Sequence, residues 1–576
     1  MTGDFKRTLP LPIQHDSIGA EVVEHALGFT DLICLWQKNP TAKPSNSYQK
    51  RALLLLNKLK LVAKDVRGST GYKLCQRNEI RSLIKRFGTP ALFLMINPSD
   101  VHSPLVGILG RMLPEHWHTK SAYERSLFVA KNPATAATFF FFHAMMSNFF
   151  GLVIKHGQQK PGLFGHSQAY YGMVEAQGQG TLHCHLLLWL HGNPNPQLLR
   201  DRMVNDECYK ERIICWMESI IHCELPNSTG IVIDSQDRPL KKPSLPPHQL
   251  DPRIAEGPSL GVDDNGFLEQ FQQFVQELAV HCNWHEHTDT CWKHLQKDEP
   301  RDDQHCRMRL NGTTRALTEV DPETQSILLC RLHSRINDFN DNIIFLLKCN
   351  MDIKYIGSGQ AAKALVYYIT DYITKSSLPV HIGFDALKHT IQQNSMKFPS
   401  NCQALTNETN QSLFTKCVNA IMARQELSHQ QVMSYLIGGG NHYKSHSYRL
   451  LQWTQFDRFI HAELSVPDED RASSNNSDVE SSVDCVESEV AGMEHTNTQD
   501  DVLVSVEPTR VSVHSDLQDY QWRSREHPFD SLSLWEYTES AHKFYLASEN
   551  ARLAKVQPTG HAEAPIDGMP TQLPTC

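Results

Sequence analysis

The stretch Val174-Glu-Ala-Gln-Gly-Gln-Gly-Thr-Leu-His-Cys-His-Leu-Leu-Leu-Trp-Leu190 predicts a β-hairpin. It consists of a strand, a turn that contains two glycines and a second strand that ends in a run of large apolar residues. Because side chains alternate between the two faces of a strand, His183 and His185 point to one face and Cys184 points to the other. The apolar run is typical of a central strand, so we expect both histidines to be buried and to need polar partners.

Glu175 and Gln177 complete a candidate metal site if the hairpin closes in the right register. A loop with an odd number of residues around Gly178–Gly180 places both side chains on the face of His183 and His185. Two imidazoles with a carboxylate or an amide can coordinate a divalent metal and leave some of its coordination positions open. A His-x-His pair taken alone is more often two half-exposed residues at the start of an apolar strand. The acid and the amide on the same face favour the metal site here.

A second candidate feature is the helix expected over residues 360–375, after a Gly-Ser-Gly turn. Tyr368 and Tyr372 are four residues apart and therefore share one face of that helix, with Lys375 on or beside it. Such a stripe can simply pack an aromatic helix into a core. It also has a chemical use, because a phenol can attack a phosphorus atom that a metal polarises. A lysine ammonium can lower the pKa of the phenol or hold the phosphate.

A second cluster of metal-ligand residue types lies between residues 281 and 306. The candidate ligands for a structural zinc ion (Zn²⁺) are His285, His287, Cys291 and Cys306. Other residues of the same types compete for the fourth position, namely His281, Cys282 and His294. The spacing is not the paired Cys-x-x-Cys form, and histidine-rich loops also occur solvated and without a ligand. Both alternatives stay open at the level of sequence.

The charge of the chain is unevenly distributed. Its 576 residues carry a net charge of −9, yet residues 463–507 hold 13 acidic residues and one basic residue, which leaves +3 for the remainder. This acidic segment is also rich in serine and asparagine, a composition typical of disordered chain. The near-neutral remainder is compatible with nucleic-acid binding but carries no strong electrostatic signature of it.

The sequence predicts a soluble intracellular protein with no membrane partner. No apolar segment follows the N-terminus, so no signal peptide is expected. Polar residues interrupt the apolar run over residues 139–150, which we expect to be too short to span a bilayer. The 15 scattered cysteines are then expected to be thiols or metal ligands.

The order of the expected elements predicts an α+β fold in which helices pack on a sheet. Strands are expected at residues 91–96, in the hairpin, and at residues 343–348 and 352–356, with a long apolar helix over 134–156. We expect a helical N-terminal region (1–88), a main domain (89–400) with an insert at about 192–320, a helical and basic-aromatic extension (401–463), a disordered acidic linker (464–515) and a tail (516–576).

Five motifs in this order resemble the replication-initiator region of Helitron transposases, also called the Helitron helicase-like N-terminal domain, of the HUH endonuclease superfamily. They are Gly88–Pro98, Asn132–Thr135, the hairpin up to Leu190, Cys349–Asp352 and Tyr368–Lys375, within a resemblance that runs from about residue 66 to 461. The most specific part is the histidine–hydrophobe–histidine strand followed by the two-tyrosine helix. The resemblance implies an antiparallel central sheet with packed helices, as in rolling-circle initiators.

The resemblance also implies a chemistry for these residues. His183 and His185 would bind Mg²⁺ or Mn²⁺, with Glu175 as a third ligand or Gln177 in its place. Tyr368 and Tyr372 match the paired nucleophiles of the family. One would attack single-stranded DNA to leave a 5′-phosphotyrosine and a free 3′-hydroxyl, and the second would act at the other end, so that strands are exchanged and rejoined.

The chain departs from this family in one main respect. Complete Helitron transposases continue into a large helicase, whereas this sequence contains no Gly-x-x-x-x-Gly-Lys-[Ser/Thr] nucleotide-binding loop. A helicase would then act in trans. The alternative is a catalytically inactive or domesticated remnant that binds single-stranded DNA. A nuclear location follows from either function, although no convincing basic targeting cluster is present. Cys184 replaces a bulkier apolar residue but faces away from the metal side.

Overall fold

The computed structural model divides the chain into two compact units, residues 16–446 and residues 1–15 with 447–576. The residues that the structure describes are 28–40, 42–62, 66–176, 180–225, 242–245, 249–259, 264–293, 295, 299–308, 310, 312–323, 326–358, 378–397, 406–425, 427–448, 503–507, 510–514, 520, 523, 525, 527, 529–543 and 563–565. Of the acidic linker predicted as disordered at 464–515, only residues 503–507 and 510–514 are described, and these form two paired strands instead. The larger unit contains the sheet and both candidate metal sites.

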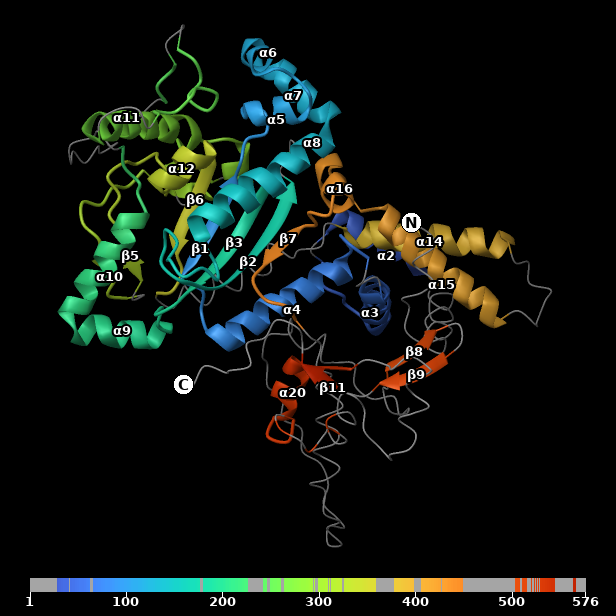
Figure 1. Ribbon diagram of the computed structural model, residues 1–576. Helices are drawn as coiled ribbons and strands as arrows, with labels where there is room; N and C mark the ends of the chain where they lie inside the picture. Colours follow the sequence, from blue (N-terminus) through green and yellow to red (C-terminus); the bar gives the residue numbers. More distant parts are fainter. Residues whose placement is uncertain are drawn as a thin grey trace. The chain divides into compact units, whose positions relative to one another are not determined.

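A five-stranded sheet in the order β6-β1-β3-β2-β7 forms the centre of the larger unit (Figure 1). Its strands are β1 (Leu92–Asn97), β2 (Ser167–Ala176), β3 (Leu182–Leu190), β6 (Asn350–Tyr355) and β7 (His442–Lys444). All four neighbouring pairs are antiparallel. Strand β3 lies in the middle of the sheet and every one of its residues is buried, so its predicted central position is confirmed. The α+β fold class with an antiparallel sheet is likewise confirmed.

One face of the sheet packs against a long apolar helix (Figure 1). This helix starts as α8 (Pro133–Thr138), with proline at its first turn, and continues as the π-helix η3 (Phe139–Ile154). Phe141, Met145 and Phe149 from η3 join one core cluster with Leu94 of β1 and Leu186 of β3. The helix predicted over 134–156 is therefore present, although most of it is wound more widely than an α-helix.

We expected this apolar segment to be too short to cross a bilayer, but its length in the structure is sufficient. Pro133–Ile154 spans 22 residues and is long and apolar enough to cross a membrane. However, 56% of its most apolar window is buried inside the protein, and most of its large side chains belong to the core cluster of the sheet. Its apolar composition is thus explained by packing within the larger unit.

Helix α4 (Thr70–Phe87) contacts the opposite face of the sheet. Glu79 of α4 accepts a hydrogen bond from Tyr171 of β2 and forms an ion pair with Lys444 of β7 at 2.8 Å. The helix ends at Gly88, whose φ of 78° is accessible to glycine at little cost, and whose carbonyl accepts a hydrogen bond from Trp189 at 2.8 Å. The predicted break at Gly88 and the strand that follows it are confirmed.

The remaining elements surround the sheet or form the second unit. In the larger unit they are α2 (Phe29–Lys38), α3 (Ser47–Val62), α5 (Pro104–Leu109), α6 (Pro114–Thr119), α7 (Ala122–Lys131), α9 (Pro196–Asn205), α10 (Glu207–Ile220), α11 (Asp264–Cys282), η4 (Asp289–Trp292), η5 (Asp303–His305), β4 (Glu319–Val320), β5 (Ile327–Leu328), α12 (Asp341–Leu347), α14 (Val380–Lys397), α15 (Thr406–Ala423) and α16 (His429–Leu436). In the second unit they are β8 (Leu503–Glu507), β9 (Arg510–His514), α20 (Leu534–Ser540), β10 (Ala541–Lys543) and β11 (Glu563–Pro565).

The strand predicted at residues 343–348 is wrong, because these residues lie in helix α12. The side chain of Asn340 caps the helix by accepting hydrogen bonds from the backbone amides of Asn342 and Ile343. Ile343 and Leu347 are buried one helical turn apart, and Lys348 ends the helix with a φ of 48°. A short apolar run is buried equally well as a strand or as a core helix, so its composition did not distinguish the two. The strand predicted at 352–356 is confirmed as part of β6.

Candidate functional site

The first candidate site is formed by the β2–β3 hairpin. Glu175 pairs directly with His183, and Met173 pairs with His185. Ala176 pairs with Leu182, so the loop between them is residues 177–181, which is an odd number. As the alternation of side chains requires, Glu175 therefore shares a sheet face with both histidines. Gln177, the other predicted ligand, lies outside the described residues.

The donor atoms of these three residues converge. The Nε2 atoms of His183 and His185 are 2.9 Å apart, and Oε2 of Glu175 lies 4.0 Å and 3.9 Å from them. Phe93 of β1 stacks on the His185 ring, with centroids 5.8 Å apart and planes 9° from parallel. The side chains of His183 and His185 are only 7% and 8% exposed, whereas that of Glu175 is 24% exposed. The cluster is therefore buried on the histidine side and accessible at the carboxylate.

Burial keeps both imidazoles neutral. Desolvation lowers the pKa of His183 to about 4 and that of His185 to about 3, the latter helped by its neighbour His183. Desolvation also raises the pKa of Glu175 to about 7, while Lys73 of α4 acts in the opposite direction. Neutral imidazole nitrogens and one carboxylate oxygen are suitable ligands for a divalent cation that keeps open positions. The residues present thus fit the metal that the sequence predicts.

The predicted nucleophiles are not described. Tyr368, Tyr372 and Lys375 all lie in residues 359–377, outside the described part of the chain. Strand β6, which precedes them in the sequence, is separated from β3 by β1 alone. Whether a tyrosine hydroxyl faces the two histidines stays a prediction.

The second candidate site brings together the four residues predicted as zinc ligands. One donor atom from each of His285, His287, Cys291 and Cys306 lies within 4.8 Å of every other. Of the competing residues, neither Cys282 nor His281 belongs to the cluster. Their backbone carbonyls accept hydrogen bonds from the side chains of Asn350 and Lys242. The third competitor, His294, lies outside the described residues.

Sequence reasoning missed the charged residues next to both clusters. Lys73 belongs to α4 and is close enough to Glu175 for the two to affect each other's pKa. Asp303 and Arg335 contact His287 at 2.6 Å and 3.1 Å. Asp303 lies within the histidine-rich stretch and was detectable there as a possible partner. Lys73 and Arg335 lie far away in the sequence, and no local pattern connects them to the sites.

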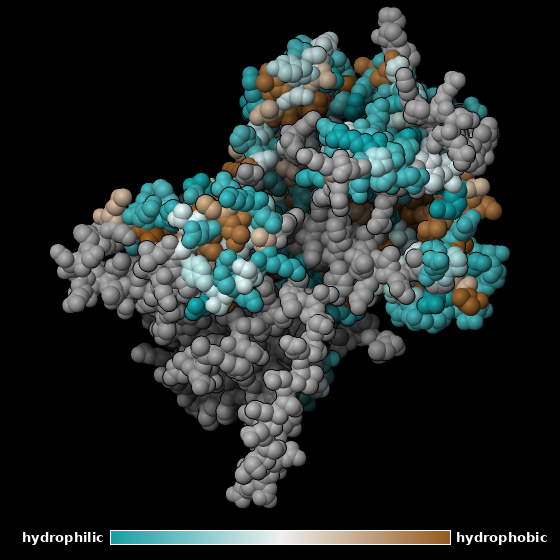
Figure 2. Space-filling view, turned by 180° about the vertical axis from the view of Figure 1, so that it is seen from behind, coloured by the Kyte–Doolittle hydropathy of each residue, from teal (hydrophilic) through white to brown (hydrophobic). Residues whose placement is uncertain are grey.

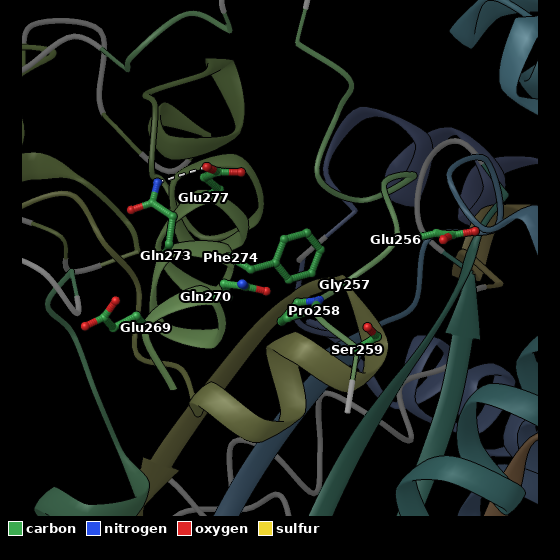
Figure 3. A pocket seen from close by; sticks show the side chains of 9 residues that line it. All are labelled: Glu256, Gly257, Pro258, Ser259, Glu269, Gln270, Gln273, Phe274 and Glu277. Atoms are coloured by element: carbon green, nitrogen blue, oxygen red, sulfur yellow. Dashed lines mark hydrogen bonds between the residues drawn. The ribbon is translucent and has the colours of Figure 1, made fainter. Parts of the chain in front are cut away.

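Other surface features do not add to these sites. An open pocket between residues 256–259 and α11 is lined by Glu256, Glu269 and Glu277, and Gln273 donates a hydrogen bond to Glu277 at 2.9 Å (Figure 3). Three carboxylates disfavour phosphate binding there. On the described part of the face shown in Figure 2, hydrophobic residues form separate patches between hydrophilic ones. The hairpin cluster is thus the better candidate for nucleic-acid chemistry.

The fold and the hairpin define an α+β protein with a candidate divalent-metal site on one face of an antiparallel sheet. Residues 33–188 match the family described as the Helitron helicase-like domain at the N-terminus. The match ends within β3, and therefore contains Glu175, His183 and His185 but neither the second cluster nor the predicted tyrosines. No curated protein matches the chain.

Proposed function

We propose that this protein is a metal-dependent DNA nicking and joining endonuclease of the HUH type, related to Helitron transposases. The observation that carries the proposal is the convergence of Glu175, His183 and His185 on one face of the central sheet. The match of residues 33–188 to the Helitron domain supports it, because that segment contains all three residues. Single-stranded DNA is the proposed substrate.

The three hairpin residues would hold Mg²⁺ or Mn²⁺. When bound, the ion would withdraw negative charge from a scissile phosphate. His183 and His185 are buried and neutral, so each offers a ring lone pair without first losing a proton. Glu175 supplies the negative charge of the site, and Lys73 favours its ionised form. The more exposed carboxylate side is where the DNA backbone would approach.

A tyrosine of the segment 359–377 would supply the nucleophile. In the proposed step, the phenol oxygen of Tyr368 or Tyr372 attacks phosphorus and the P–O3′ bond breaks. The phenol proton goes to the leaving 3′-oxygen, and the products are a 5′-phosphotyrosine and a free 3′-hydroxyl. One phosphodiester replaces another, so the reverse attack by a 3′-hydroxyl rejoins DNA without a further energy source. Lys375 would hold the phosphate or favour the phenolate.

The decisive experiment detects the covalent adduct. The full chain is incubated with Mn²⁺ and a labelled library of single-stranded oligonucleotides, and protein-linked label is measured after denaturation. We expect an adduct from the wild type, and its loss in the Tyr368→Phe/Tyr372→Phe double variant and in His185→Ala. Tyr123→Phe and His116→Ala are matched controls, because Tyr123 is 76% exposed and both positions lie outside the hairpin.

Two outcomes contradict the proposal. If the wild type gives no more adduct than the double tyrosine variant, the protein is not a nuclease of this type. Retained binding of single-stranded DNA in that case identifies the alternative, a catalytically inactive or domesticated remnant. If His185→Ala keeps full activity, the metal site is elsewhere. A nuclear location and a helicase acting in trans are further parts of the proposal. The proposed substrate is the DNA of a transposable element in the nucleus, and residues 1–576 contain no Gly-x-x-x-x-Gly-Lys-[Ser/Thr] loop.

A further inference from the structure

We propose that His285, His287, Cys291 and Cys306 form a structural zinc site that fastens the segment 284–306 beside the edge of the central sheet. The site is distinct from the hairpin cluster and does not depend on the proposed nuclease activity. Both cysteines are free thiols, only 4% and 6% exposed. Buried thiols beside imidazoles, with no disulfide between them, are a typical setting for zinc.

The distances between donor atoms fit a tetrahedral ion. Nε2 of His285 lies 3.2 Å from Nδ1 of His287, 3.3 Å from Sγ of Cys306 and 3.8 Å from Sγ of Cys291. With Zn–N bonds of about 2.0–2.1 Å and Zn–S bonds of about 2.3 Å, tetrahedral geometry separates neighbouring donors by about 3.3–3.8 Å. The three distances from His285 therefore agree with this geometry to within a few tenths of an ångström, and all four donors lie within 4.8 Å of one another.

A carboxylate determines which nitrogen of His287 faces the metal. Nε2 of His287 lies 2.6 Å from Oδ1 of Asp303, and Arg335 donates a hydrogen bond to the other carboxylate oxygen at 2.8 Å. Nη1 of Arg335 also lies 3.1 Å from Nε2 of His287. An ionised carboxylate can only accept a hydrogen bond, so the short contact with Asp303 places the proton on Nε2 of His287. Nδ1 is then unprotonated and faces His285. Carboxylate–histidine pairs of this kind orient the ligands of many zinc sites.

The ligand set favours zinc and a structural role. Thiolates and imidazoles together select zinc over Mg²⁺ or Mn²⁺, which prefer oxygen ligands. Four protein ligands fill a tetrahedral shell and leave no position for substrate or water, which distinguishes structural from catalytic zinc. The second cluster thus has a different chemistry from the hairpin, where three ligands leave positions open.

The neighbouring hydrogen bonds show what the zinc would stabilise. The backbone amide of His285 donates to the carbonyl of Arg335 at 2.7 Å. Just before it, Asn283 exchanges two hydrogen bonds with the backbone of Met351 in β6, at 2.9 Å and 3.1 Å. Among the described residues of the segment 284–306, only Cys291 and Cys306 are buried, so the metal would supply much of the stability of this segment. Zinc would therefore hold this segment next to the edge strand β6.

Metal content of the purified full chain tests the site directly. We expect close to one zinc per chain by elemental analysis, and loss of most of it in Cys291→Ser and in Cys306→Ser. Cys215→Ser is the matched control, because Cys215 is an exposed cysteine of α10, outside the cluster, and this variant should keep its zinc. Replacement of zinc by Co²⁺ in the wild type should produce the intense visible bands of tetrahedral cobalt together with sulfur-to-cobalt charge transfer. The cobalt spectrum does not require any variant to fold.

Asp303→Asn tests the orientation of His287 without removing a ligand. We expect its zinc affinity, measured by competition with a chelator, to fall by about 10- to 100-fold. Asp302→Asn is its matched control, since Asp302 contacts His305, which is not part of the cluster. Equal affinities for the two variants would refute the role of Asp303.

A wild type with well under one zinc per chain, and a cobalt spectrum without tetrahedral bands, would overturn the zinc site. Neither measurement involves DNA, so its outcome is separate from that of the adduct experiment.

Discussion

Cys184 shows how a single residue separates the core from the candidate metal site. Its neighbours His183 and His185 face the metal side, whereas Cys184 is completely buried in the apolar core on the other face. The core is tightly packed there, because a Cβ atom added at Gly172 of β2 would lie 3.1 Å from Sγ of Cys184 and 3.0 Å from Cδ1 of Leu186. The small side chain at position 184 is therefore matched to the glycine beside it.

This packing predicts a specific pair of effects. Gly172→Ala should lower the free energy of unfolding by about 1–3 kcal/mol through overpacking. Adding Cys184→Ala should recover part of that loss, because it removes the sulfur that the new methyl group meets. Urea unfolding of both single variants and the double variant measures the coupling. If the effects of the two substitutions on the free energy of unfolding simply add, the predicted coupling is wrong.

Mn²⁺ binding by Cys184→Ala should equal that of the wild type, because the sulfur faces away from the ligands.

At the scale of elements, the cap of α12 explains why residues 341–347 are helical. Asn340 is 1% exposed, and its amide makes hydrogen bonds in both directions. Its oxygen accepts from the first helical amides, and its nitrogen donates to the carbonyl of Ile220 at 3.0 Å. The same side chain therefore starts α12 and joins it to the end of α10. Such a cap satisfies amides that a helix leaves without partners.

Substitutions at this cap should separate its two roles. Asn340→Ala should cost about 2 kcal/mol or more, since the cap is lost and the Ile220 carbonyl is left without its donor. Asn340→Asp keeps the accepting oxygen and should cost less. Asn342→Ala, at an exposed position of the same helix, is the control and should change stability little. Thermal or urea unfolding measures all three. Equal losses for Asn340→Ala and Asn342→Ala would show that the cap does not stabilise the helix.

At the scale of the whole molecule, buried and half-buried histidines couple stability to pH. Desolvation lowers the pKa of His102, His333 and His442 to about 4 in each case. The hydrogen bonds of His333 also favour a neutral ring, because its Nδ1 accepts from the backbone amides of Arg335 and Ile336. These rings are neutral in the folded protein and bind protons near pH 6.5 when it unfolds.

The sign of the pH dependence follows from these shifts. A lowered pKa contributes stability above about pH 6.5, and this stability is lost as the pH falls toward 4. We expect the free energy of unfolding to decrease between pH 6.5 and 5, by up to about 1.4 kcal/mol per pH unit for each such histidine. Urea unfolding at constant zinc and without Mg²⁺ or Mn²⁺ measures it. His442→Gln should reduce the slope, while His116→Gln, at an exposed position, should not. An unchanged slope in His442→Gln would contradict this assignment.

Much of the candidate hairpin site could be predicted from the order of residues alone. Alternation of side chains is a local property of an extended chain, so His183 and His185 had to share a face once β3 was a strand. An odd loop then placed Glu175 beside them, as the register shows. The residue types in the second cluster likewise indicated zinc chemistry, although their spacing is not the paired Cys-x-x-Cys form. These features depend on neighbours a few residues apart.

Long-range contacts could not be predicted in this way. The same apolar run is buried as a strand or as a helix, and the cap contacts of Asn340 made residues 341–347 a helix. Between the described cysteines, only the folded structure shows that Cys306 lies in the cluster whereas Cys282 does not. Lys73 and Arg335 reach the two sites from distant segments. Packing of the whole unit positions such residues, because side chains far apart in sequence meet only when the chain has folded around its core.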